Sequence, residues 1–312
     1  MLDDRTDDTV KVVVAALTFR RPDDLAALLP TLAEQAERST DDVSVLIVDN
    51  DPDAGARGQV EAFGRGVRYL HAATPGIAAA RNAALDAADE ADLLVFIDDD
   101  ERPVANWLAL LLATWRASRP AAVVGPVVSE YAVQPDSWVL AGRFFDRRRL
   151  TTGTTTSIAA TNNLLLDLSA VRRAGLRFDE RFGLTGGSDT LFTRALHASG
   201  GRLVWCDEAV VTDVVPPNRV TREWVLQRAY RSGNSDALTS LALTRGPLPR
   251  LALRARLVAR GGIRVAGGGA SMVAGRLLGR LPLQARGRRT VARGAGMLAG
   301  TAGTAYVEYK RD

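Results

Sequence analysis

The chain has 312 residues, of which 46% are hydrophobic and 24% charged, a composition typical of a globular protein. Single hydrophobic cores stop growing at about 250–300 residues, so we expect one large domain with an appendage. The single cysteine, Cys206, excludes an internal disulfide and fits a reducing compartment. Residues 1–8 are polar and rich in acids, the opposite of a secretory signal, so we expect a disordered N-terminus on a cytoplasmic protein.

The net charge of +4 conceals two oppositely charged parts of the chain. From Arg245 onward there are 14 basic and two acidic residues, a net charge of +12. This leaves 26 of the 40 basic and 34 of the 36 acidic residues before Arg245, a net charge of −8. A basic tail of this kind indicates an anionic partner, either a membrane surface or a nucleic acid.

Short apolar runs alternate with helical patterns in the first hundred residues. The runs are rich in β-branched residues, end in polar ones, and cover residues 10–17, 43–48, 67–70 and 93–97. Helical patterns follow at 25–32 and 77–88. Buried strands that alternate with helices predict a doubly wound α/β sheet, in which ligands bind beyond the carboxyl ends of the strands.

Further strands and helices are expected up to residue 244. We expect a helix at 107–115, strands at 121–128, 161–166, 203–206 and 209–211, and helices at 188–197 and from 224 onward. Residues 129–160 are irregular, with aromatic, basic and Thr-rich patches. Long irregular segments within a compact domain are usually functional or mobile loops.

Four consecutive acids, Asp98-Asp99-Asp100-Glu101, follow the apolar run at 93–97. Adjacent carboxylates repel each other and raise each other's pKa unless they share a cation, for which Mg2+ or Mn2+ is suited. A solvated acidic turn is the alternative. The chain has neither a Gly-rich dinucleotide-binding turn after its first strand nor a Walker loop, so the phosphates of a bound nucleotide need another source of neutralisation. A metal held by carboxylates is one such source.

A second candidate site lies at Gly186-Gly187-Ser188-Asp189, where flexible glycines lead into the predicted helix 188–197. Acids stabilise helix N-termini, and Ser188 suits an N-cap, so Asp189 is explained either by helix stability or by a catalytic role. Spacing alone does not separate the two explanations.

Taken together, these motifs resemble the family 2 glycosyltransferases, which have the GT-A fold. The matching pieces run in collinear order through residues 10–240: Thr18, Val48-Asp49-Asn50, Pro75 to Leu85, Phe96 to Glu101, Gly186 to Phe192, and Val215 to Arg219 leading into Arg228 to Ser235. The resemblance implies a GT-A type, Rossmann-like mixed sheet flanked by helices. It also implies transfer of a hexosyl unit from a nucleotide donor, usually with inversion at the anomeric carbon.

The resemblance assigns the donor site by matching positions. Asp49 would accept a hydrogen bond from a uracil or thymine ring, and Thr18 would line the same pocket. Arg81 would face the nucleotide. Asp98 and Asp99 would approach the ribose and the diphosphate. UDP or dTDP sugars are therefore the favoured donors.

The catalytic groups follow from the same match. Asp100 would be the principal ligand of Mg2+ or Mn2+, and Asp189 the general base that deprotonates the acceptor hydroxyl. The chain departs from the family pattern twice: Ser188 replaces a common Glu, and Asp213 replaces a frequent His that helps to hold the metal or diphosphate. Asp213 is either a metal ligand or only an acid at the end of a strand.

The basic region 245–312 contains Leu, Val and Ala interrupted by arginines every few positions. None of its stretches reaches the ~18 uninterrupted apolar residues of a spanning helix. Basic, moderately apolar helices suit an anionic membrane surface, and a helical cap on the catalytic domain or a dimer contact is the alternative. We expect no nucleic-acid binding, because aromatics are absent from this region until Tyr306.

The sequence thus predicts a disordered segment 1–8, a catalytic domain 9–244, and a basic helical region 245–312 on the inner face of the cell membrane. The predicted enzyme is a metal-dependent glycosyltransferase of polysaccharide biosynthesis in the cell envelope, acting on a glycan or lipid-linked acceptor. The alternatives are a nucleotidyltransferase and a non-catalytic nucleotide-sugar-binding or membrane scaffold protein. The sequence does not predict the sugar, the linkage or the oligomeric state.

Overall fold

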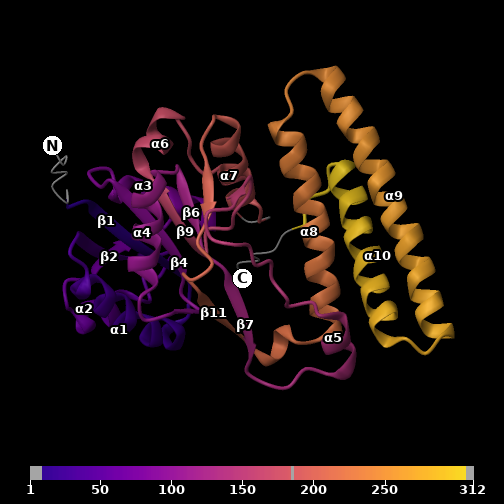
Figure 1. Ribbon diagram of the computed structural model, residues 1–312, viewed down its shortest axis with the longest axis horizontal. Coiled ribbons are helices and arrows are strands. Elements are labelled where there is room, and N and C mark those ends of the chain that lie inside the picture. Colours follow the sequence, from indigo (N-terminus) through magenta and orange to yellow (C-terminus); the bar gives the residue numbers. More distant parts are fainter. Residues whose placement is uncertain (1–8, 184–185, 307–312) are drawn as a thin grey trace, which may run out of the picture. The chain divides into compact units, whose positions relative to one another are not determined.

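The computed structural model describes residues 9–183 and 186–306, so the predicted disordered segment 1–8 lies outside the described residues. The described residues form two compact units (Figure 1). The first unit contains residues 9–128, 147–183 and 188–213. The second contains residues 129–146, 186–187 and 214–306.

An eight-stranded mixed sheet is the centre of the first unit, in the order β3-β2-β1-β4-β9-β6-β10-β8. Its strands in chain order are β1 (Lys11–Thr18), β2 (Asp42–Asp49), β3 (Arg68–His71), β4 (Leu93–Asp98), β6 (Ala122–Val124), β8 (Thr155–Thr156), β9 (Asn163–Asp167) and β10 (Leu203–Trp205). Strands β1 to β4 are parallel neighbours, whereas β9 runs antiparallel between β4 and β6. This confirms the predicted fold class.

A second sheet has three strands, β5 (Glu101–Pro103), β11 (Val211–Val215) and β7 (Val127–Tyr131), in the order β5-β11-β7. The sequence predicted one strand at 121–128, but β6 ends at Val124 and β7 begins at Val127. The backbone at Gly125 packs so closely on Asn163 and Ala209 that a Cβ there would clash with both. The chain can therefore leave one sheet and enter the other only because residue 125 has no side chain.

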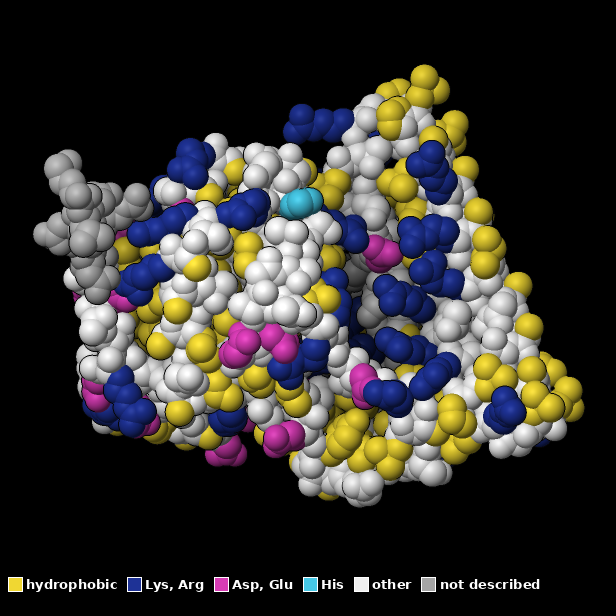
Figure 2. Space-filling model, viewed as in Figure 1, with side chains coloured by type: hydrophobic (Ala, Val, Ile, Leu, Met, Phe, Trp, Pro, Cys, Tyr) yellow, Lys and Arg dark blue, Asp and Glu magenta, His cyan; other side chains and the backbone are white. Residues whose placement is uncertain are grey.

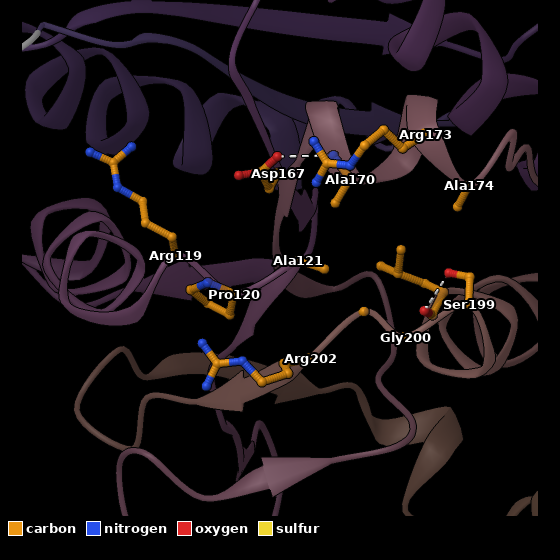
Figure 3. A pocket seen from close by; sticks show the side chains of 12 residues that line it. Arg119, Pro120, Ala121, Asp167, Ala170, Arg173, Ala174, Ser199, Gly200 and Arg202 are labelled. Carbon is orange, nitrogen blue, oxygen red and sulfur yellow. Dashed lines mark hydrogen bonds between the residues drawn. The ribbon is translucent and has the colours of Figure 1, made fainter.

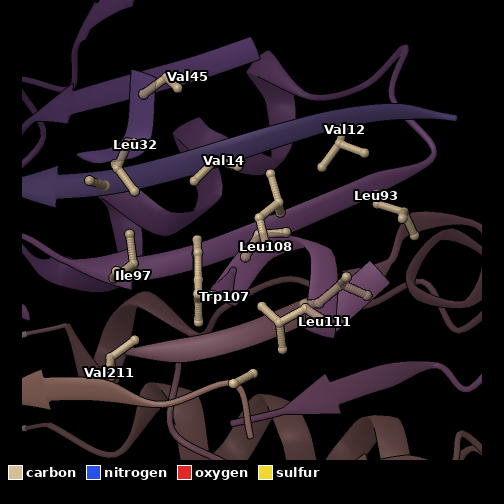
Figure 4. Close-up of a cluster of buried hydrophobic side chains, with 14 of the residues drawn as sticks. Val12, Val14, Leu32, Val45, Leu93, Ile97, Trp107, Leu108, Leu111 and Val211 are labelled. Atoms are coloured by element: carbon tan, nitrogen blue, oxygen red, sulfur yellow. The ribbon is translucent and has the colours of Figure 1, made fainter. Parts of the chain in front are cut away.

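Helices cover both faces of the large sheet (Figure 1). They are α1 (Pro22–Arg38), α2 (Arg57–Phe63), α3 (Ile77–Ala87), α4 (Trp107–Ser118), α6 (Leu168–Arg173), the 3-10 turn η1 (Glu180–Phe182) and α7 (Ser188–Ala198). Helices α1, α2 and α4 pack on one face, where Trp107 and neighbouring aliphatic side chains form a core (Figure 4). Helices α3, α6 and α7 pack on the other. Alternate residues of each central strand face the two cores, which explains the continuous apolar runs.

The second unit is mainly helical, with α5 (Ser137–Gly142), η2 (Pro217–Arg219), α8 (Arg222–Leu243), α9 (Pro247–Leu277) and α10 (Leu281–Thr301). The sequence placed a boundary at residue 244, whereas α8 packs with α10 in this unit. Glycines explain the packing, because a Cβ at Gly233 of α8 or at Gly296 of α10 would clash with the facing helix backbone. Within the described ranges, no helix combines the length and the apolar character that crossing a membrane requires.

Candidate active site

Three predicted site residues lie at one edge of the large sheet, because their strands are parallel and in register. Thr18 at the end of β1 is paired with Asp49 of β2, and Leu17 is paired with Asp98 of β4. The carboxyl ends of neighbouring parallel strands meet at the same edge, where α/β proteins bind ligands. The structure therefore brings Thr18, Asp49 and the Asp98–Glu101 acids together.

Hydrogen bonds connect the acids to the loop that follows β1. The hydroxyl of Thr18 donates to Oδ2 of Asp99 over 2.8 Å. The guanidinium of Arg21 donates to Oδ1 of Asp99 over 3.0 Å and to Oδ2 of Asp100 over 2.6 Å. Arg21 thus bridges two of the four acids, a role that the sequence analysis missed. The one hint of this role in the sequence is the basic pair Arg20-Arg21 in the loop after the first strand.

The acids carry strongly perturbed pKa values. Loss of hydration and repulsion from Asp100 raise the pKa of Asp98 to about 7, although the positive charge of Arg81 opposes the shift. Loss of hydration also raises the pKa of Asp99 to about 6, against the lowering effect of Arg21 and Thr18. Glu101 is fully buried, and burial raises its pKa well above the usual range. Burial is thus the main cause of the raised pKa values, and the nearby arginines offset it only in part.

The acids suit a divalent cation that is shared with a phosphate ligand. The described residues contain no group of three His, Cys, Asp or Glu side chains that could hold a metal by themselves. Mg2+, however, is usually held by one or two carboxylates together with substrate phosphates and water. Asp99 and Asp100 both reach one cation, the guanidinium of Arg21, so their carboxylates converge. This donor set fits a metal that binds together with a diphosphate.

Asp49 is fully buried and organises the loop after β2. Its carboxylate accepts hydrogen bonds from the backbone N–H groups of Asp51 and Ala56 and from the hydroxyl of Tyr69, each over 2.9 Å. Burial and the neighbouring Asp49 raise the pKa of Tyr69 to about 12, so its hydroxyl stays protonated and donates. A carboxylate has about four acceptor positions, and these three donors leave one of them unused.

Asn50 ties the loop after β3 to the same edge. Its side-chain amide donates to the carbonyl of Thr74 over 2.8 Å, and its carbonyl accepts from the N–H of Gly76 over 3.2 Å. Gly76 has a positive φ of 114° and opens helix α3. The neighbouring residues Asp49 and Asn50 thereby hold two loops that border the carboxyl ends of the parallel strands.

Arg81 links the acids to the second candidate motif. It lies on α3, is 7% exposed, and donates to the hydroxyl of Ser188 over 2.8 Å. Its positive charge also lowers the pKa of Asp98. Arg81 is therefore not a solvent-exposed residue on the helix surface. Its burial and its contacts are consistent with a role in the candidate site. Ser188, the first departure from the family pattern, is itself fully buried against this guanidinium.

Asp189 follows Ser188 in the first turn of α7 and is partly exposed. One of its carboxylate oxygens accepts from the N–H of Thr190 over 2.7 Å. The helix is anchored by Thr193, whose hydroxyl donates to the carbonyl of Ala159, and by Phe192, whose ring stacks on Phe178 at 4.2 Å. The Asp189 carboxylate is thus partly exposed on an anchored helix, so an acceptor hydroxyl can come within hydrogen-bond reach of it, as a general base requires.

Asp213, the second departure, lies directly opposite Glu101 in the register of β11 and β5. It forms an ion pair with Arg147, whose positive charge also lowers the pKa of Glu101. Arg147 therefore offsets the negative charge that Asp213 adds beside the acids. Arg147 was not predicted as this partner, because it lies in the irregular segment 129–160, whose contacts carry no signal in the sequence.

A cavity of about 300 Å³ lies in the same unit. Its lining includes Arg147, Arg148, Asn162, Thr190 and Trp205. Arg148 donates to the hydroxyl of Thr156 over 2.9 Å, and its guanidinium lies 5.8 Å from the centre of the Trp205 ring. Thr190, which follows the candidate base Asp189 in the chain, is part of this lining, so the cavity combines a hydroxyl with arginine and tryptophan groups.

A second cavity of about 480 Å³ lies at the opposite edge of the sheet, where β6 and β10 begin (Figure 3). Its lining includes Arg119, Arg173 and Arg202, but none of the predicted site residues. Arg202 donates to the carbonyl of Ser118 at the end of α4, over 2.5 Å. Such contacts satisfy free carbonyls at helix C-termini and need no ligand.

Comparison with known proteins decides the family. The family model for glycosyl transferase family 2 matches residues 13–175, more than half of the chain. The chain belongs to glycosyl transferase family 2. This glycosyltransferase is 34% identical over 232 residues to the succinoglycan biosynthesis protein ExoM of Rhizobium meliloti (strain 1021), an alignment that covers 73% of this chain and 74% of that protein.

Solved structures with the same fold include a mannosyltransferase complex and a complex of another protein with UDP. The mannosyltransferase PcManGT from Pyrobaculum calidifontis, in complex with GDP-Man and Mn2+, superimposes with a TM-score of 0.61 at 18% identity, over 95% of this chain and 87% of that chain. TarS 1-349 of S. aureus, in complex with UDP, superimposes with a TM-score of 0.52 at 15% identity, over 97% and 94% of the two chains. The glycosyltransferase has the GT-A fold, as predicted.

Proposed function

We propose that this glycosyltransferase moves a sugar, with inversion, from a nucleoside-diphosphate donor to a glycan or lipid-linked acceptor in polysaccharide biosynthesis at the cell envelope. The observation that carries the proposal is the position of Arg81, which donates to Ser188 beside the candidate base and whose charge acts on Asp98 in the acidic cluster. One buried cation thus connects a donor site with a base. The 34% identity to a succinoglycan biosynthesis protein supports the acceptor class.

The donor nucleotide binds at the carboxyl ends of β1, β2 and β4 in this proposal. Asp49 offers its remaining acceptor position to the N–H of a uracil or thymine ring when the following loop opens, and Thr18 borders the same pocket. Asp98 and Asp99 approach the ribose and the diphosphate. UDP or dTDP donors are favoured, because a buried carboxylate can pair with the single ring N–H of these bases.

Asp100 and Asp99 would hold Mg2+ or Mn2+ together with the diphosphate, and Asp213 is a further candidate ligand. The bound metal would supply electrostatic stabilisation of the negative charge that develops on the leaving nucleoside diphosphate. Arg21 pairs with the same two carboxylates, so its guanidinium would lie close enough to the diphosphate to offset part of its negative charge.

Asp189 would take the proton of the acceptor hydroxyl as that oxygen attacks the anomeric carbon from the side opposite the leaving group. Ser188 and Arg81 hold the turn that presents the Asp189 carboxylate. The acceptor sugar would occupy the cavity lined by Arg148, Thr190 and Trp205, where an aromatic ring offers an apolar face and the arginine offers donors to hydroxyl oxygens.

A panel of UDP, dTDP and GDP sugars with Mn2+, scored for slow release of nucleoside diphosphate, tests the proposal without a known acceptor. We expect release from a UDP or dTDP sugar that requires the metal. Release of nucleoside monophosphate or pyrophosphate would indicate a nucleotidyltransferase instead. Binding of every donor without turnover, in the presence of the true acceptor as well, would indicate a non-catalytic binding protein.

A further inference from the structure

Helix α9 in the second unit exposes a long apolar face. Its exposed side chains include Leu248, Leu251, Val258, Ile263, Val273 and Leu277, of which Leu248, Ile263 and Leu277 are 77%, 71% and 81% exposed. At 100° per residue these six positions fall on one side of the helix, and alanines and glycines occupy the positions between them. Figure 2 shows hydrophobic side chains along the outer edge of this helix.

The opposite side of α9 is the side that packs inside the unit. Leu257 is 2% exposed and packs with Met297 of α10 and Leu241 of α8. Gly261 and Gly268 approach α10 so closely that a Cβ at Gly268 would lie 2.8 Å from the carbonyl oxygen of Gly287. Helix α9 therefore packs within the unit through one side only. Its exposed apolar side makes no contact that this packing requires.

Arginines border the exposed face on both sides. Helical spacing places Arg256 and Arg260 along one border and Arg254 and Arg276 along the other. All four are exposed. Residues 245–306 contain twelve arginines and no acidic residue. The face thus combines an apolar centre with cationic margins, whose long side chains can extend their charges away from the apolar surface.

We propose that the exposed face of α9, with its arginine margins, lies in the headgroup region of a bilayer that contains anionic lipid. The helix has 31 residues, a length of about 46 Å at 1.5 Å per residue. Its apolar side chains enter the acyl boundary while the arginines meet lipid phosphates. A second copy of this chain fits less well, because pairing two such faces would bring arginine margins of like charge together. The proposal rests on the second unit alone and not on the proposed reaction.

Flotation of the full chain with vesicles tests this proposal. We expect binding to vesicles of phosphatidylcholine with 30% phosphatidylglycerol, about tenfold weaker binding to pure phosphatidylcholine, and loss of binding at high salt. The variant Val258→Glu/Ile263→Glu places two charges in the centre of the apolar face and is expected to weaken partitioning about a hundredfold. Far-UV circular dichroism and urea unfolding verify that the variant is folded.

The control variant Val133→Glu/Leu140→Glu adds the same two charges at exposed positions of the same unit, which are 43% and 38% exposed. We expect this variant to bind vesicles within about threefold of the parent chain, because it lacks charges on the α9 face. Equal loss in both variants, or no loss in the α9 variant, would overturn the proposal. So would sedimentation equilibrium that reports a dimer which Val258→Glu/Ile263→Glu dissociates, in a chain that does not bind vesicles.

Discussion

Arg21 pairs with two residues of the acidic cluster. Its replacement by Gln is expected to lower the free energy of unfolding. The guanidinium donates to Asp99 and Asp100 over 3.0 and 2.6 Å. The side chain of Asp99 is 6% exposed and that of Asp100 19%. Gln keeps a polar side chain of similar reach but removes the positive charge. The variant Arg21→Gln therefore leaves the buried carboxylates without their nearest cation.

The magnitude follows from burial. Removing one partner of a fully buried ion pair costs about 3–5 kcal/mol, because an uncompensated charge remains. The Arg21 side chain is 35% exposed, so solvent screens part of its interaction. After this discount we expect Arg21→Gln to lower the free energy of unfolding by about 1–2 kcal/mol at pH 8 in metal-free protein.

The effect depends on pH, and the raised pKa values determine its sign. An aspartate in an unfolded chain titrates near about 3.9, whereas Asp98 and Asp99 titrate at about 7 and about 6 in the folded protein. The folded state therefore binds more protons over this interval, and the free energy of unfolding falls as the pH rises. Without Arg21, the pKa values of Asp98 and Asp99 in the folded protein rise further, so the free energy of unfolding falls more steeply with pH. The difference between variant and parent should grow from pH 5 to pH 8.

Urea unfolding of both proteins at pH 5, 6.5 and 8, without metal, measures this difference. The control is Arg20→Gln, which removes a neighbouring arginine that is 50% exposed and pairs with Asp51 and Asp53. We expect the control to cost at most about 0.5 kcal/mol, with little dependence on pH. A loss in Arg21→Gln that stays constant or shrinks toward pH 8 would refute the assignment of Arg21 as the cation of this cluster.

Three further outcomes are expected. Isothermal titration with UDP present should show Mn2+ affinity falling about tenfold from pH 8 to pH 5.5, because protons compete for the carboxylates of raised pKa. Gly294→Val should lower the free energy of unfolding by about 1–3 kcal/mol in urea, since a Cβ there would lie 2.8 Å from the carbonyl oxygen of Gly261. Ser188→Ala should lower it by about 1–3 kcal/mol, because Arg81 loses a buried acceptor.

Each of these outcomes has a control. Gly262 faces open space, so Gly262→Val should cost little, and an equal loss in both glycine variants would contradict the close packing of α9 and α10. Ser199 is exposed, so Ser199→Ala should leave stability unchanged. A loss as large as that of Ser188→Ala would show that the cost does not come from the buried contact with Arg81. If the Mn2+ affinity did not change with pH, the acids with raised pKa values would not be the metal ligands.

The positions of the acids were predictable because parallel strands in register bring their carboxyl ends together. Four apolar runs ending in polar residues therefore sufficed to place Thr18, Asp49 and Asp98 at one edge. The cations that neutralise the acids were not predictable. Arg21 and Arg147 reach them through loops, and loop paths depend on long-range packing that carries no periodic signal in the sequence.

The resemblance predicted a mixed sheet, but the sequence did not show which strand runs antiparallel. Strand β9 is as apolar as β4 and β6, to which it runs antiparallel, so its direction depends on the connection that precedes it and not on its composition. The sequence of the basic region does not show one clear apolar face, because helical spacing places Leu253 and Leu257 on the same arc as several arginines. The structure shows the reason: these leucines pack toward α8 and α10, while a different side of α9 stays exposed and apolar.

We propose that Asp189 deprotonates the acceptor, while Asp99 and Asp100 hold the metal. The most direct test measures acceptor-dependent transfer by Asp189→Asn, with Asp86→Asn as a control at an acid that is 61% exposed and paired with Arg177. We predict that kcat for transfer falls about 10²–10⁴-fold in Asp189→Asn alone, while Mn2+-dependent donor binding stays within about twofold of the parent. Transfer at the parental rate by Asp189→Asn would contradict the account.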